Sequence, residues 1–162
     1  MRADSGQKIV NLALQGGGSH GAFAWGVLDR LLEEERLAIE GITATSAGAV
    51  NAVALAYGLS TGGREEAKKA LEFLWKRISN IASNMLTPSL FDYLYGSFGL
   101  DHSPSYIVLN TLSEFFSPYQ LNPFNYSPLK NLLEEMVDFE RLRKQAAVKL
   151  FLCATNVRTS KL

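Results

Sequence analysis

The stretch ITATSAGAVNA, residues 42 to 52, decides the fold of this chain. It begins with a short apolar strand pattern and continues into small apolar residues, which predicts a buried strand followed by a buried helix. The turn between them carries Ala44-Thr-Ser-Ala-Gly48, a near match to the G-x-S-x-G nucleophile elbow. Small residues flank the serine of such an elbow because the strand and helix backbones nearly touch there. Ser46 is therefore the candidate nucleophile, and Ala44 and Gly48 are the small elbow residues.

Ser46 also fits a simpler role. A serine before an apolar helix is a common N-cap, whose side chain accepts a hydrogen bond from the first turn of the helix. The strand before Ser46 and the buried helix after it favour the elbow, and the positive end of that helix would face an oxyanion formed at the serine. The residues alone leave both interpretations open.

A glycine cluster, Gly16-Gly-Gly-Ser-His-Gly21, follows an apolar run at residues 9 to 14. Its spacing fits G-x-G-x-x-G, which alone is a weak dinucleotide-binding signal. That function needs an acidic residue at the end of the second strand, whereas Glu40 precedes that strand instead of ending it. An oxyanion hole fits better, because a glycine-rich loop after a strand presents bare backbone N–H groups beside the serine. A tight turn without a ligand is the third interpretation.

Two motifs together resemble the patatin-like phospholipase family. They are LQGGGSHGAF, residues 14 to 23, and ITATSAGAVNA, residues 42 to 52, and the spacing between them is also similar to that of the family. Short stretches around residues 127 to 129, 137 to 142 and 154 to 159 resemble its bacterial members. The resemblance covers about residues 8 to 162, and it is the pairing of the two motifs that makes it specific.

The resemblance implies a lipid acyl hydrolase, of phospholipase A or esterase type, that uses a Ser–Asp dyad without a catalytic histidine. Ser46 matches the family's nucleophile. The residues that match its oxyanion hole are Gly16, Gly17 and Gly18, with the N–H of Ala47 as a further donor. The implied substrate is a phospholipid or another lipid ester.

The sequence departs from the family at two places. Ala44 replaces the usual first glycine of the elbow, which makes the turn tighter. The family's catalytic aspartate lies in a downstream Asp-Gly-Gly or Asp-Gly-Ala motif, and no such motif occurs in residues 1 to 162. The expected fold is thus the N-terminal part of one patatin-like domain, incomplete at the C-terminus.

Five titratable residues could replace the missing aspartate, namely Asp92, Asp101, Asp138, His20 and His102. A serine and a histidine form the usual activated pair, but the resemblance gives His20 no role as a base. Asp138 lies on an expected amphipathic helix, which favours a solvated or helix-pairing role. Asp92 and Asp101 lie in the irregular segment, where the sequence does not place them, and His102 is most simply a surface residue.

The rest of the chain predicts an α/β fold, a parallel sheet with helices on both faces, because continuous apolar strands alternate with helices. The expected strands are residues 9–14, 39–45 and 148–154. The expected helices are residues 22–36, 46–57, 61–78 capped by Thr61, and one that starts at Ser127-Pro128 and buries Leu129, Leu132, Leu133, Met136 and Phe139. Residues 1–8 are a polar tail, and residues 9–162 are one domain.

Residues 79 to 128 are expected to be irregular and lid-like, because they hold all five prolines and many aromatic residues. This segment could be a lid or a wall for an acyl chain, or its aromatic residues could simply pack a core. The aromatic residues in question are Phe91, Tyr93, Tyr95, Phe98, Phe115 and Phe116.

Composition limits the other functions. Lys and Arg number 16, as do Asp and Glu, so the basic excess typical of a nucleic-acid-binding protein is absent. The single cysteine, Cys153, excludes a multi-cysteine zinc site, and nothing indicates another metal or a cofactor. Without a signal peptide or an apolar run long enough to span a bilayer, we expect a cytoplasmic protein, with a peripheral membrane contact left open.

We also expect residues 1 to 162 alone to have little esterase activity and poor solubility. A serine without its base is a weak nucleophile, and the apolar strand at residues 148 to 154 would lack a neighbour. Two other functions remain alternatives: an inactive chain that binds acyl lipid, and a nucleotide-binding α/β domain.

Overall fold

The computed structural model describes residues 6–85, 127–156, 159 and 161. Contacts divide the chain into two units, Met1–Arg77 with Leu132–Leu162, and Ile78–Asn131. The first unit holds the sheet and most of the described helices, and it is the unit that positions the candidate site.

A three-stranded parallel sheet forms the centre of the first unit. Its strands are β1 (Lys8–Leu14), β2 (Leu37–Thr45) and β3 (Lys149–Cys153), in the order β1-β2-β3. Both strand pairs are parallel, with one register shift between Val10 and Asn11. The α/β class and the parallel sheet are confirmed.

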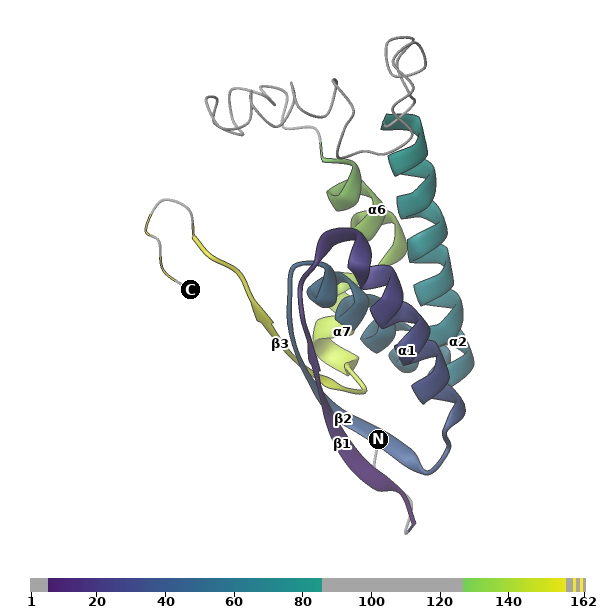
Figure 1. The fold of residues 1–162 in the computed structure, drawn as a ribbon. Helices are drawn as coiled ribbons and strands as arrows, with labels where there is room; N and C mark the ends of the chain where they lie inside the picture. The colour runs from purple at the N-terminus through teal and green to yellow at the C-terminus, as the bar shows by residue number, and fades with distance from the viewer. Residues whose placement is uncertain (1–5, 86–126, 157–158, 160, 162) are drawn as a thin grey trace. The chain divides into compact units, whose positions relative to one another are not determined.

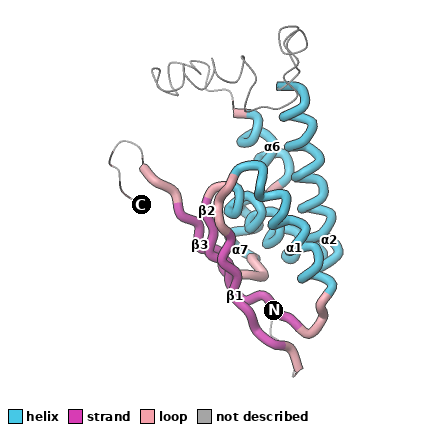
Figure 2. Tube along the Cα trace, in the orientation of Figure 1, coloured by secondary structure: helices cyan, strands magenta, loops and turns pink. Residues whose placement is uncertain are grey.

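The described helices of this unit cover one face of the sheet. Figures 1 and 2 show α1 (Gly21–Glu33), α7 (Phe139–Gln145) and the first part of α2 (Ala47–Met85) on the same side of the strands. The row Leu12, Ile42 and Leu150 faces these helices and is buried or half-buried, as the register requires.

The other face of the sheet carries the row Ala13, Thr43 and Phe151, whose side chains are exposed. A second covering layer of helices is not found among the described residues, so that part of the expectation stays a prediction. Within the same residues, no helix combines the length and the apolar character needed to cross a bilayer.

Helix α2 joins the two helices expected at residues 46–57 and 61–78. Its backbone leaves helical geometry at Gly62 and Gly63, and Gly63 has φ +74°. Thr61 does not cap the second part, contrary to the prediction: its hydroxyl donates to the carbonyl oxygens of Tyr57 and Gly58 in the preceding turn. The glycine pair, not a capping side chain, makes the break.

The helix expected after Ser127 is present but shorter. Ser127 Oγ accepts a hydrogen bond from Lys130 N at 3.3 Å and caps α6 (Pro128–Met136). The chain then breaks at residues 137 and 138, because Asp138 caps α7 by accepting a hydrogen bond from Arg141 N at 2.9 Å.

The stripe expected to be buried on that helix is only partly so. Leu132 is buried, Leu133 and Met136 are half-buried, and Leu129 and Phe139 are exposed. Phe139 belongs to the next helix, which explains why it leaves the stripe.

Residues 79–85, which were expected to be irregular, continue helix α2 instead. The six aromatic residues of the segment expected to be irregular, and Asp92, Asp101 and His102, lie outside the described residues. The lid or acyl-wall interpretation of this segment stays a prediction.

The C-terminal end of α1 is fixed by an arginine from α2. The guanidinium of Arg64 donates to the carbonyl oxygens of Leu32 and Glu34, both at 3.1 Å, and it also contacts the carbonyl oxygen of Leu37. Nearby, the hydrogen bonds from Arg36 lower the pKa of the Glu34 carboxyl to about 2. Arg64 thus binds the last carbonyl oxygens of α1 and Arg36 pairs with Glu34, and both positive charges offset the unfavourable interaction of the acidic residues with the helix dipole.

Candidate active site

The carboxyl ends of the parallel strands bring the two sequence motifs together. Gly16 follows the end of β1 and Ser46 follows the end of β2, while Cys153 pairs with Thr45 in the register of β3. In open parallel sheets, ligands bind outside these ends. The glycine loop and the elbow thus share the edge at which a site is expected.

Ser46 has the backbone of a strained turn. Its φ is +51°, and it is the only described residue other than glycine with a positive φ. Its carbonyl oxygen accepts hydrogen bonds from Ala49 N at 2.9 Å and Val50 N at 3.2 Å, and no described hydrogen bond uses its hydroxyl. An N-cap serine normally has an extended backbone and a side chain that is hydrogen-bonded to the helix. Ser46 has neither feature, and its side chain is exposed.

Glycines allow the elbow to close. A Cβ added to Gly48 would lie 2.4 Å from the carbonyl oxygen of Leu14, so no larger residue fits between α2 and the end of β1. A Cβ added to Gly16 would lie 2.9 Å from Ser46 Cβ and 3.6 Å from Ser46 Oγ. Ala44, the departure at the first elbow position, is buried on the helical face of the sheet, with 6% of its surface exposed.

The glycine loop offers backbone donors at the same edge of the sheet as the serine. Gly18 has φ +56°, a left-handed conformation that favours glycine, and it starts the short 3-10 helix Gly18–His20. None of the described backbone hydrogen bonds uses the N–H of Gly17, Gly18 or Ala47 as its donor. Free N–H groups at the starts of two helices are what an oxyanion hole requires.

His20 forms hydrogen bonds within the glycine loop, and no described hydrogen bond joins it to Ser46. Its Nδ1 lies 3.1 Å from the carbonyl oxygen of Gly17, and its backbone N–H donates to the same oxygen at 3.1 Å. These contacts fix the carbonyl of Gly17 toward His20.

No described hydrogen bond joins the hydroxyl of Ser46 to a side chain that could serve as its base. Among the aspartates considered for that role, Asp138 caps α7 and the other two lie outside the described residues. Glu40 lies within β2, not before it as expected, and its carboxylate pairs with Lys149 at 3.3 Å. Among the described residues, no acidic side chain directly follows the end of β2, where a dinucleotide ribose would be held.

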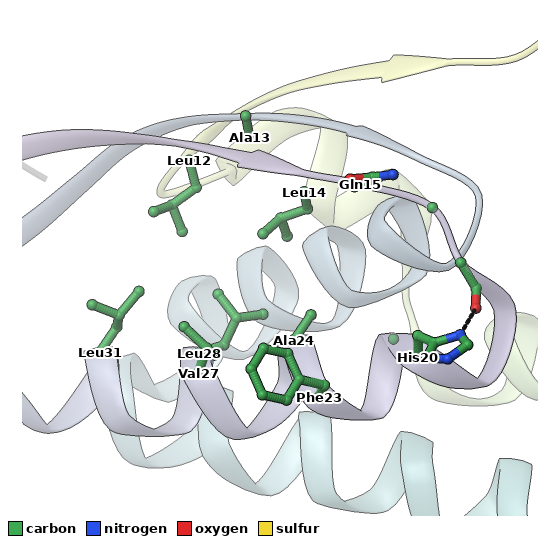
Figure 3. A pocket seen from close by; sticks show the side chains of 13 residues that line it. Leu12, Ala13, Leu14, Gln15, His20, Phe23, Ala24, Val27, Leu28 and Leu31 are labelled. Atoms are coloured by element: carbon green, nitrogen blue, oxygen red, sulfur yellow. Dashed lines mark hydrogen bonds between the residues drawn. The ribbon is translucent and has the colours of Figure 1, made fainter.

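A groove of about 600 Å³ starts at the glycine loop and runs between β1 and α1. Figure 3 shows Leu12 and Leu14 pointing from β1 toward α1, whose Phe23, Val27 and Leu31 form the opposite wall. Gly16, Gly17 and His20 line the end of the groove at the loop. An apolar groove therefore ends at the glycine loop, whose Gly16 packs against Ser46, although Ser46 itself does not line the groove.

Asn51 is a supporting residue that the sequence patterns did not single out. It is fully buried, its Nδ2 donates to the carbonyl oxygen of Gly21 at 2.9 Å, and its Oδ1 accepts from Trp75 Nε1 at 2.8 Å. Asn51 thus ties the first residue of α1 to both parts of α2. A single polar side chain inside an otherwise small and apolar helix was the signal that could have found it.

The comparisons with known proteins give one result. A family model described as "Patatin-like phospholipase" matches residues 12–161. No curated protein and no solved structure matched the chain. Among the described residues there is also no cluster of three or more His, Cys, Asp or Glu side chains that could hold a metal ion.

Proposed function

Since the chain belongs to the patatin-like phospholipase family, we propose that it is a lipid acyl hydrolase whose nucleophile is Ser46. The observation that carries this proposal is the backbone of Ser46, with φ +51° and a hydroxyl free of helix capping. Strain of this kind persists where the surrounding structure enforces it, and it is common at catalytic residues. The proposed substrate is a phospholipid or another lipid ester.

The proposed reaction is an acyl transfer through a covalent intermediate. Ser46 Oγ attacks the ester carbonyl carbon while its proton passes to an aspartate base, which is not among the described residues. The N–H groups of Gly17, Gly18 and Ala47 hold the developing oxyanion. The alcohol then leaves with a proton, and water hydrolyses the acyl-serine to release the acid and restore the hydroxyl.

A second function competes with hydrolysis: binding of acyl lipid without turnover. The observation that favours it is that Ser46 Oγ has no carboxylate or imidazole partner among the described residues. In serine hydrolases, loss of the activating partner costs on the order of 10⁴ in turnover. The two functions predict different reactivity of the same serine.

Release of p-nitrophenol from p-nitrophenyl butyrate, at protein concentrations high enough to follow a single turnover, tests the proposal. We expect Ser46→Ala to lower this release at least tenfold. Ser83→Ala, an exposed serine on α2, is the matched control and should change nothing. Release from Ser46→Ala within tenfold of the parent would contradict hydrolysis by Ser46 in this chain and favour the second function, binding of acyl lipid without turnover.

A further inference from the structure

We propose that the groove between β1 and α1 binds the hydrocarbon chain of the acyl group and selects its length. The proposal deepens the proposed function and rests on it for the position of the ester group at Ser46. The occupant is a single extended acyl chain whose carboxyl end lies at the glycine loop.

The chemistry of the lining changes from one end of the groove to the other. Its polar side chains, Gln15 and His20, lie at the end formed by the glycine loop. Beyond that end the walls are aliphatic or aromatic, and none of the described residues that line the groove is charged. This distribution matches a molecule with one polar end and a long apolar remainder.

The far wall exposes apolar surface that an acyl chain would cover. Phe23 is 79% exposed and Val27 is 45% exposed, one turn apart on α1. A volume of about 600 Å³ is within the range of pockets that hold small ligands. Removing this surface from water would stabilise the bound chain in proportion to the area covered.

Continuity with the candidate oxyanion hole decides between an acyl chain and other apolar occupants. Gly16 lines the groove, and the same glycine packs against Ser46, where its added Cβ would lie 3.6 Å from Ser46 Oγ. An ester carbonyl held at the loop would therefore direct its acyl chain into the groove. An ester substrate would occupy both the oxyanion hole and the groove. A packing helix or a second copy of the chain would fill the groove without placing a reactive group at Ser46.

The length of the groove sets a preference for chain length. Phe23, Val27 and Leu31 are spaced by four residues, so the wall that they form spans about 12 Å at the rise of an α-helix. An extended hydrocarbon chain advances about 1.25 Å per bond, as the three bonds between consecutive Cα atoms also do on average. The wall therefore accommodates about ten methylene groups.

Binding is tested without turnover, on the full chain carrying Ser46→Ala. The probe is dansyl-labelled undecanoic acid below its critical micelle concentration, with displacement by unlabelled fatty acids of four to fourteen carbons. We expect affinity to rise about fourfold per added methylene up to about ten carbons and then to level off.

Two groove variants and one control localise the site. Phe23→Ser removes the most exposed wall residue, and Val27→Trp fills the groove; each should weaken binding at least tenfold. Phe73→Ser, an exposed phenylalanine of α2 outside the groove, should change affinity less than twofold. Circular dichroism and thermal unfolding confirm that the variants fold.

Equal binding by the groove variants and the parent would overturn the proposal, as would failure of the probe to bind. A dimer that Val27→Trp dissociates, with no binding of the probe, would show that a second copy covers the groove and would also overturn it. The binding assay is independent of the reactivity of Ser46. The groove can bind acyl chains when Ser46 is unreactive, and Ser46 can be reactive when the groove does not bind acyl chains.

Discussion

At the residue scale, the backbone of Ser46 is the feature that separates an elbow from an ordinary cap. A left-handed conformation costs a residue with a Cβ about 1–2 kcal/mol, and glycine avoids that cost. We expect Ser46→Gly to raise the free energy of unfolding by about 1 kcal/mol relative to Ser46→Ala, which keeps the strain. Urea unfolding of the two variants measures the difference, and a less stable Ser46→Gly would contradict the assigned conformation.

Gly48 gives a second prediction at this scale. A methyl group there would lie 2.4 Å from the carbonyl oxygen of Leu14, so Gly48→Ala should lower the free energy of unfolding by at least about 2 kcal/mol. Gly26→Ala on α1 is the matched control, because nothing lies within 4 Å of the added Cβ, and it should stabilise the helix by about 0.5–1 kcal/mol. Similar effects of the two substitutions in thermal unfolding would rule out the close approach.

The residue scale also shows what the sequence can and cannot predict. The pattern around Ser46 predicted a turn between strand and helix, because small flanking residues have few other uses there. It did not predict the hydrogen bond between Asn51 and Trp75, since the two residues are far apart in sequence and meet only when α2 bends at Gly62 and Gly63.

At the element scale, the buried hydrogen bonds of Asn51 hold α1 and the two parts of α2 together. Asn51→Leu removes the side-chain donor to the carbonyl oxygen of Gly21 and leaves Trp75 Nε1 without its acceptor, and we expect a loss of about 2–4 kcal/mol in the free energy of unfolding. Trp75→Phe removes one of these groups. A double-mutant cycle should give a coupling of about 1 kcal/mol, and additive effects would show that the hydrogen bond contributes nothing.

Element boundaries were predictable where a residue with a strong local preference marks them. Ser127 and Pro128 start α6 as expected, because proline fits the first helical position and serine caps it. The break before α7 was missed, since Asp138 lies in a pattern that continues the apolar stripe and becomes a cap only in the fold.

At the scale of the whole molecule, the uncovered face of the sheet predicts self-association. Phe151 is 59% exposed on that face, in a row with Ala13 and Thr43. We expect Phe151→Thr, which keeps a β-branched residue in the strand, to reduce association of the full chain in light scattering. Leu129→Thr, an exposed leucine of α6, is the control. Association that is the same in all three proteins would contradict this role of the face.

The parallel sheet was predictable from its apolar strands and the helical patterns between them, whereas the groove was not. Its walls come from alternate residues of β1 and from one face of α1, and both patterns look like ordinary core positions in the sequence. In the fold, Phe23 and Val27 line the groove and keep much of their surface exposed. Exposure of this kind is set by tertiary packing, not by local preference.

The central claim is that the fold sets Ser46 apart from the other serines as a nucleophile beside an oxyanion hole. Labelling of the native full chain with a fluorophosphonate, mapped by peptide mass spectrometry, tests it most directly. Ser19, Ser60 and Ser83 serve as internal standards, and the urea-unfolded chain gives the background. We predict labelling at Ser46 well above every other serine, lost on unfolding and in Ser46→Ala. Labelling at Ser46 no faster than at the internal standards, or equal in the folded and unfolded chain, would contradict the account.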